Sequence, residues 1–143
     1  MSLKNCLFLF GLLCFLGCGP TYIYEQEYTV ENAEWQYADS MVFETVVADS
    51  SQFYDLYLDL DHRTSYPYEN LYVLIKTYFP DGQQLTKQVS LDLMDQVGRW
   101  HGKCSGEQCQ LRIDLQRQTL FAQPGPYRFV VEQYMRRDSL PGI

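Results

Sequence analysis

The feature that most constrains the fold is a strict two-residue alternation in the segment FYDLYLDLDHR, residues 53–63. Successive side chains of a β-strand point to opposite faces of the sheet, whereas a helix would mix these positions around its axis. This segment is therefore predicted to be a strand with one dry face and one solvated face. Its apolar side chains occupy the even positions and its carboxylates the odd ones: Tyr54, Leu56, Leu58 and Leu60 against Asp55, Asp59 and Asp61.

Several other segments show the same period. Residues 71–79, LYVLIKTYF, are apolar on both faces and are predicted to form a central strand. The turn-forming sequence Pro80-Asp81-Gly82 follows, so residues 85–93 are expected to complete a hairpin. Residues 41–47, 111–115 and 127–132 also alternate, and a further extended segment is expected near Gln26. Only residues 94–100 could form a helical turn.

About seven short strands, without convincing helices or βαβ spacing, predict an all-β protein. The expected architecture is a single antiparallel β-sandwich of immunoglobulin-like size, formed by residues 27–143.

The N-terminal segment predicts export and lipid attachment. Lys4 precedes an apolar run over residues 7–16, which is too short to span a bilayer but has the length of a signal-peptide core. Gly17 then places a small residue before Cys18, as lipoprotein signal peptidase requires. Residues 1–17 are expected to be removed, and residues 18–26 to be a lipidated tether carrying acyl chains such as palmitate on Cys18. An ordinary secretory signal or an uncut anchor is the alternative.

Net charge narrows the possible partners. Without residues 1–17 the chain has 10 basic and 18 acidic residues, a net charge of −8. Such a surface repels nucleic-acid phosphates and anionic headgroups, so neither nucleic-acid binding nor electrostatic membrane docking is expected. Attachment to a membrane must then come from the lipid.

Two cysteines remain in the expected domain. Cys104 and Cys109 enclose Ser-Gly-Glu-Gln, a polar loop that can bring them within disulfide distance in an oxidising compartment. Zinc binding with His101 and His62 is the alternative, but the spacing is irregular and a structural zinc site needs four ligands. We therefore expect a disulfide and no metal.

Carboxylates and histidine also allow a catalytic or calcium-binding interpretation. Asp55, Asp59 and Asp61 share a strand face, but alternate strand residues lie about 7 Å apart, too far for one ion without a neighbouring loop. His62 follows Asp61, yet no serine has the context of a nucleophile. The sequence therefore predicts a solvated acidic face, no enzyme activity and no cofactor.

The twelve tyrosines suggest a binding surface. Most are expected to be half-buried sheet residues, but Tyr72, Leu74 and Tyr78 lie on one side of the predicted central strand. Such a face suits contact with a partner protein. Binding of envelope carbohydrate by coplanar aromatic rings is the alternative function.

Three parts of the sequence together resemble the GldH family of gliding-motility lipoproteins: the signal ending at Cys18, the segment FYDLYLDLDHRTSYPYENLYVLIKTYFPDG, and the closing YRFVVEQYMRRDSLPGI. The resemblance implies a lipid-anchored cell-envelope protein that works with other proteins of the gliding machinery. Cys18 carries over as the lipidation site, and no active-site residue does.

Two departures from the family pattern add expectations. Members of the family continue beyond Leu-Pro-Gly for about one strand, so the sandwich is expected to lack a final strand through truncation of the chain. No acidic run follows Cys18, which favours a periplasm-facing anchor over export to the cell surface.

Overall fold

The computed structural model of the chain describes residues 21–143, and its regular elements are nearly all antiparallel strands. One short 3-10 helix, η1 (Glu31–Ala33), precedes them. The strands are β1 (Glu34–Gln36), β2 (Ser40–Val47), β3 (Phe53–Arg63), β4 (Asn70–Tyr78), β5 (Gln84–Asp92), β6 (Lys103–Ser105), β7 (Gln108–Leu120), β8 (Gly125–Gln133) and β9 (Ser139–Pro141).

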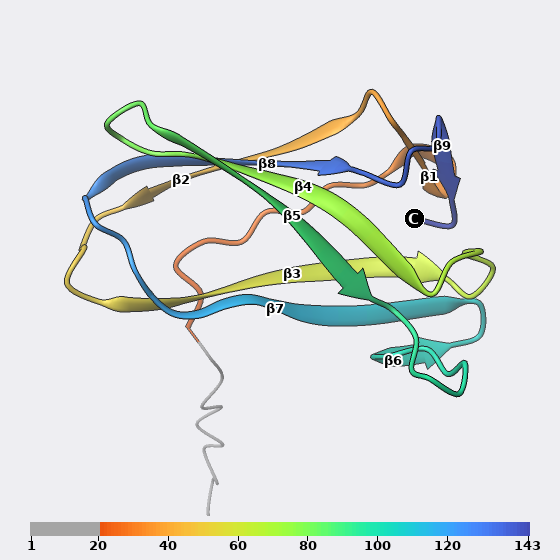
Figure 1. Ribbon diagram of the computed structural model, residues 1–143. Helices are drawn as coiled ribbons and strands as arrows, with labels where there is room; N and C mark the ends of the chain where they lie inside the picture. Colours follow the sequence, from red (N-terminus) through yellow and green to blue (C-terminus); the bar gives the residue numbers. More distant parts are fainter. Residues whose placement is uncertain (1–20) are drawn as a thin grey trace, which may run out of the picture.

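Two sheets form the layers of a sandwich (Figure 1). The larger sheet has the strand order β2-β8-β4-β5, and the smaller has the order β3-β7-β6. β1 and β9 pair with each other in a separate two-stranded sheet. The all-β antiparallel sandwich predicted from the sequence is confirmed.

The alternating segment 53–63 forms β3, as predicted. It pairs with β7 from Arg63 opposite Gln108 to Phe53 opposite Leu120. The register shifts on either side of Leu56. Near this irregularity Gln118 has a φ of 49°, and its backbone N–H donates to the Asp55 carboxylate at 2.8 Å. A polar side chain therefore satisfies a backbone donor where the ladder is irregular.

The predicted hairpin is formed by β4 and β5, which pair from Tyr78 opposite Gln84 to Asn70 opposite Asp92. Gly82 has a φ of 83° in the connecting turn, a value that glycine adopts without steric cost. β8 pairs with the other edge of β4, so the prediction of a central strand is also confirmed.

The core lies between the inner faces of the two sheets. Its buried residues from the larger sheet include Leu71, Val73, Leu91 and Val131. The partly buried residues that pack against them from the smaller sheet are Leu58, Leu60, Leu111, Ile113 and Leu115. These are the apolar positions of the alternating segments, because only one face of each strand can point inward.

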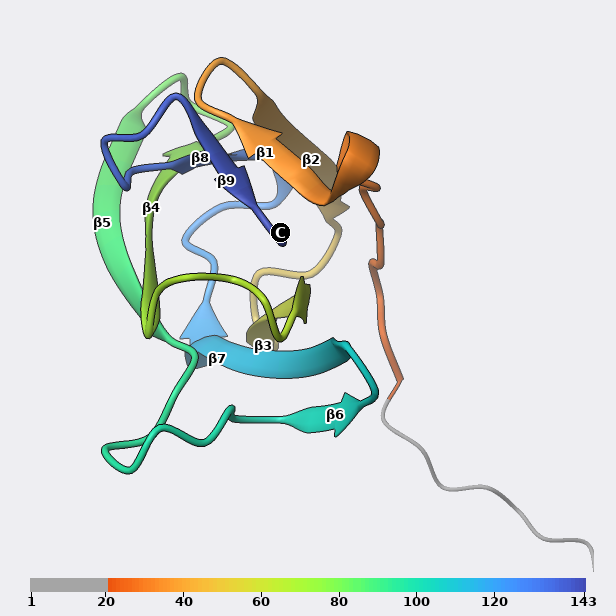
Figure 2. The same ribbon diagram turned by 90° about the vertical axis from the view of Figure 1, so that its right-hand side faces the viewer.

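One end of the sandwich is covered by β1 and β9 (Figure 2). Trp35 and Leu140 are opposite each other in register, and both are buried. Gly142 has a φ of 96°, and a Cβ atom there would lie 3.2 Å from the backbone of Tyr66. Close packing of the last residues against Tyr66 therefore requires glycine at this position.

Residues 94–100, the one segment with a possible helical turn, form a loop closed by a bridge between Met94 and Trp100. The Asp95 carboxylate accepts hydrogen bonds from the backbone N–H groups of Val97 and Arg99, which stabilises the loop. The extended segment expected near Gln26 belongs to no strand, since residues 21–30 have no ladder partner. The expectation of a missing final strand stays a prediction.

Candidate functional site

The predicted contact residues Tyr72, Leu74 and Tyr78 all lie on the outer side of β4. They alternate with Leu71 and Val73, which are buried in the core. The Tyr72 side chain is 36% exposed, and Leu74 and Tyr78 are half-buried. We call these three residues the β4 face. It is a partly apolar strip in the middle of the larger sheet.

Charged side chains border the β4 face. Lys76 lies between Leu74 and Tyr78 along the strand and forms an ion pair with Glu132 of β8 at 2.8 Å. The hydrogen bond from Lys76 to Glu132 raises the pKa of the Lys76 ammonium group. The Arg128 guanidinium lies over the Tyr78 ring, 5.2 Å from its centroid. One face of Tyr78 is therefore already occupied by a cation.

The outer side of the smaller sheet has a different chemistry. Arg112 of β7 donates two hydrogen bonds to Asp59 of β3, at 2.7 and 2.5 Å. Arg117 donates to Asp114 on the same strand. We call the outer side of β3, β6 and β7 the β3–β7 face. Its strands carry four acidic and four basic side chains: Asp55, Asp59, Asp61 and Asp114, and Arg63, Lys103, Arg112 and Arg117.

Arg112 also joins this face to the N-terminal segment. Its guanidinium donates to the Tyr22 hydroxyl and lies 5.4 Å from the Tyr22 ring centroid and 5.2 Å from that of Tyr57. The hydrogen bonds to Asp59 and Tyr22 raise the pKa of Arg112 further above its normally high value. Arg112 therefore holds residue 22 against the β3–β7 face.

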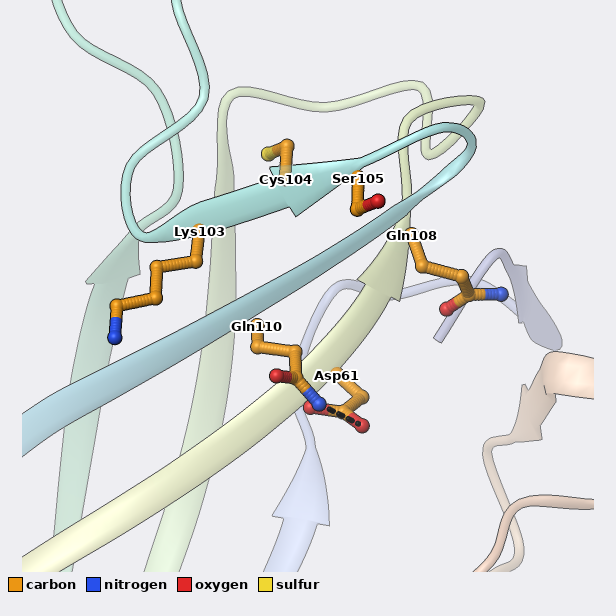
Figure 3. A pocket seen from close by; sticks show the side chains of 6 residues that line it. All are labelled: Asp61, Lys103, Cys104, Ser105, Gln108 and Gln110. Carbon is orange, nitrogen blue, oxygen red and sulfur yellow. Dashed lines mark hydrogen bonds between the residues drawn. The ribbon is translucent and has the colours of Figure 1, made fainter.

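The end of the β3–β7 face forms an open polar groove lined by Asp61, Lys103, Cys104, Ser105, Gln108 and Gln110 (Figure 3). Gln110 donates to Asp61 at 3.3 Å, a weak hydrogen bond between β7 and β3. Cys104 and Cys109 are opposite each other in the β6–β7 hairpin and are joined by a disulfide. The groove is lined by amide and hydroxyl groups, one carboxylate and one ammonium group, which can form hydrogen bonds with a polar ligand or partner.

His62 lies on the opposite side of β3 from Asp61 and is buried. Its Nδ1 atom is 3.1 Å from the Arg63 carbonyl oxygen, and its ring packs 4.7 Å from that of Trp100. Alternation along the strand separates the imidazole from the carboxylate beside it in sequence. The structure therefore does not bring His62 and Asp61 together as a catalytic pair.

Within residues 21–143, no group of three or more His, Cys, Asp or Glu side chains could hold a metal ion. Asp59, one of the three carboxylates considered for calcium, is paired with Arg112. No helix in the same residues is long and apolar enough to cross a membrane. Cys18, the predicted lipidation site, lies outside the described residues.

Sequence reasoning missed the contact of Tyr22 with Arg112 and that of Tyr78 with Arg128. The two residues of each pair are far apart in the chain, and neither pair belongs to a motif. An arginine on the outward position of a strand was the one available signal, because guanidinium groups stack readily on aromatic rings.

The chain is similar in sequence to a known protein family. The model of a family described as GldH lipoprotein matches residues 22–143. A protein of Christiangramia forsetii described as a gliding motility lipoprotein GldH homolog is 26% identical over 134 residues, which are 93% of this chain and 81% of the relative. The gliding motility lipoprotein GldH of Flavobacterium johnsoniae is 21% identical over 145 residues, covering 100% of this chain and 89% of the relative. No solved structure matches the chain.

Proposed function

The chain belongs to the GldH lipoprotein family, and from this premise we propose that it is a non-enzymatic assembly component of the gliding machinery that works through protein contacts. The observation that supports this proposal is the family match, which spans residues 22–143 and so covers the whole sandwich. Gliding motility and a lipoprotein nature are common to the relatives by name. We further propose that the protein faces the periplasm.

Tethering is the proposed mechanism. Acyl chains on Cys18 contribute about 0.8 kcal/mol for each buried methylene, and two or more chains make attachment durable. An anchored domain meets other membrane-bound proteins at a raised effective concentration, so modest contacts are sufficient for assembly. A lipid anchor also fits the acidic composition of the chain, which offers no electrostatic attraction to headgroups.

The β4 face is the proposed contact surface for a protein partner. Tyr72 and Leu74 provide apolar area next to the Lys76–Glu132 ion pair, a combination typical of interfaces with an apolar centre and a polar rim. Carbohydrate binding would need flat, open aromatic faces. Arg112 lies over Tyr22 and Tyr57, and Arg128 over Tyr78, which favours the protein-contact proposal.

The tether is tested by Cys18→Ala in the full chain, expressed in a gliding host. We expect the variant to be lost from the membrane fraction and gliding to fail. Cys14→Ala, which changes another cysteine of the leader segment, is the matched control and should keep both. Membrane attachment and gliding by Cys18→Ala cells would overturn the tethering mechanism.

The contact surface is tested by Leu74→Lys, followed by crosslinking in native membranes. We expect loss of crosslinked partners and impaired gliding, because a charge in the middle of an apolar contact is costly to bury. Leu85→Lys makes the same change at an exposed leucine that pairs with Thr77, on the other side of the sheet, and should behave like the unmodified protein. Equal crosslinking by both variants would remove the β4 face from the mechanism.

A further inference from the structure

We propose that the β3–β7 face is the membrane-proximal side of the domain, so that the β4 face points away from the bilayer. The occupant of the β3–β7 face is the lipid surface in which the acyl chains of Cys18 are anchored. This inference rests on the proposed lipid anchor. It adds an orientation, which the anchor alone does not fix.

The tether between the proposed lipid site and the sandwich is short. Four residue steps separate Cys18 from Tyr22. An extended chain spans at most about 3.6 Å for each residue, so residue 22 lies no more than about 14 Å from a lipidated Cys18. A domain held so closely has little freedom to turn its far side toward the membrane.

The tether meets the sandwich at the β3–β7 face. Arg112 binds both the hydroxyl group and the ring of Tyr22, and Asp59 fixes Arg112 through two hydrogen bonds. In Figure 1 the N-terminal segment crosses from β1 to the side of the molecule formed by β3 and β7. The Tyr28 hydroxyl donates to the Val42 carbonyl on β2, which holds the segment across the open side of the sandwich. Tyr22, four residues after the proposed lipid site, therefore lies against the β3–β7 face.

The strands of the β3–β7 face differ in net charge from the rest of the molecule. Residues 21–143 have 10 basic and 18 acidic side chains, yet the strands of the β3–β7 face have four of each. Much of the net negative charge therefore lies elsewhere on the molecule. The strands of this face therefore add no net charge that anionic headgroups would repel, and acidic side chains in the segments beside them include Glu107 of the β6–β7 turn and Glu25 and Glu27 of the N-terminal segment.

Exposed apolar side chains lie on the same face and on the N-terminal segment beside it. Ile23 follows Tyr22 and is 65% exposed. Phe53 and Leu120 are opposite each other in register at one end of the face, and they are 69% and 54% exposed. Transfer of apolar and aromatic side chains from water to the interfacial region of a bilayer lowers their free energy. They would add contacts to those made by the lipid anchor.

Depth-dependent quenching tests the orientation. The full lipidated protein is placed in phosphatidylethanolamine and phosphatidylglycerol vesicles that contain lipids with nitroxide headgroups. A fluorophore is attached to a single new cysteine, either Gln110→Cys on the β3–β7 face or Gln88→Cys on the outer side of β5. The two sheets are about 10 Å apart, so we expect about twofold or greater quenching at position 110 relative to position 88.

A variant tests the role of Arg112. Arg112→Ala removes both contacts with Tyr22, so the difference in quenching between positions 110 and 88 should shrink. Arg117→Ala is the matched control. It also removes an arginine paired with an aspartate, but the contacts of Tyr22 are retained. Its quenching difference should equal that of the unmodified protein.

The outcomes separate the two proposals. Equal quenching at the two positions, or stronger quenching at position 88, on protein that stays bound to vesicles would overturn the orientation and leave the anchor intact. Failure of the lipidated protein to bind vesicles would overturn the anchor, and the orientation with it. The comparison of labels in the unmodified background does not depend on how Arg112→Ala folds.

Discussion

The two outer faces of the sandwich differ in how they deal with outward-pointing side chains. On the β3–β7 face, aspartates and arginines satisfy one another, and Arg112 of one of these pairs also holds the N-terminal segment. On the β4 face, apolar and aromatic side chains stay partly exposed beside one ion pair. The difference indicates that charged outward side chains can satisfy one another along a sheet, whereas apolar outward side chains such as those of the β4 face stay available for contact.

The largest expected effect separates the inner and outer sides of β4. Leu71→Ala should lower the free energy of unfolding by about 2–5 kcal/mol, because Leu71 is fully buried and a cavity would remain. Leu74→Ala, three residues later on the outer side, should cost about 1 kcal/mol or less. Urea unfolding followed by tryptophan fluorescence measures both. Similar losses would mean that the β4 face is part of the core.

The next effect compares the hairpins that lie beside the two faces. The disulfide closes a loop of six residues in β6–β7, and the chain-entropy model gives it about 2 kcal/mol. Cys104→Ser combined with Cys109→Ser should lower stability by this amount, measured by thermal unfolding. Adding a reductant should lower the stability of the unmodified protein, because it breaks the disulfide of the β6–β7 hairpin. The double variant lacks this bond, as the β4–β5 hairpin does, so the reductant should leave its stability unchanged. An equal response to reductant in both proteins would contradict the assignment.

A third effect concerns Tyr66, which is buried inside the molecule and not on either outer face. Burial raises the pKa of Tyr66, which donates a hydrogen bond to the Asn70 carbonyl at 3.2 Å. The unfolded chain loses this proton near pH 10, while the folded chain keeps it to higher pH. Stability is therefore fully present below about pH 10 and falls as pH rises above it.

Tyr66→Phe checks this contribution. We expect a flatter loss of stability above pH 10, measured by urea unfolding between pH 7 and pH 11. At pH 7 the variant should lose only the hydrogen bond, about 1 kcal/mol. An unchanged alkaline slope would show that Tyr66 does not contribute to the loss.

The smallest effect concerns the ion pairs of the two faces. Asp59 and Arg112 are about half exposed, whereas Lys76 and Glu132 have only about a quarter of their side-chain surface exposed. Double-mutant cycles should therefore give a coupling energy for Asp59 and Arg112 that falls steeply with added salt, and a coupling for Lys76 and Glu132 that falls less. The reverse order would mean that the β3–β7 face is the more buried one.

Much of the fold follows from periodicity. Residues 41–47, 53–63, 71–79 and 85–93 are predictable as strands because each spans enough residues for a period of two to be visible. β1, β6 and β9 have three residues each, too few to show any period, and sequence reasoning missed all three. Their positions depend on what they cover, such as the packing of Trp35 against Leu140 at the end of the sandwich.

The candidate surfaces divide in the same way. Alternation along the sequence is sufficient to place Tyr72, Leu74 and Tyr78 on one side of a strand. It cannot indicate that Arg128 covers Tyr78, since the register of β4 against β8 brings these residues together.

The sequence by itself determined the class of fold, the inward and outward positions of the long strands, and the resemblance to a lipoprotein family, because these depend on local patterns. Only the tertiary structure decided which sheet holds the N-terminal segment and which aromatic rings of the outer faces are covered by arginines. The physical reason is that the contact of Tyr22 with Arg112 joins residues 90 positions apart. Such a contact exists only after two sheets have packed and fixed the register of β3 against β7.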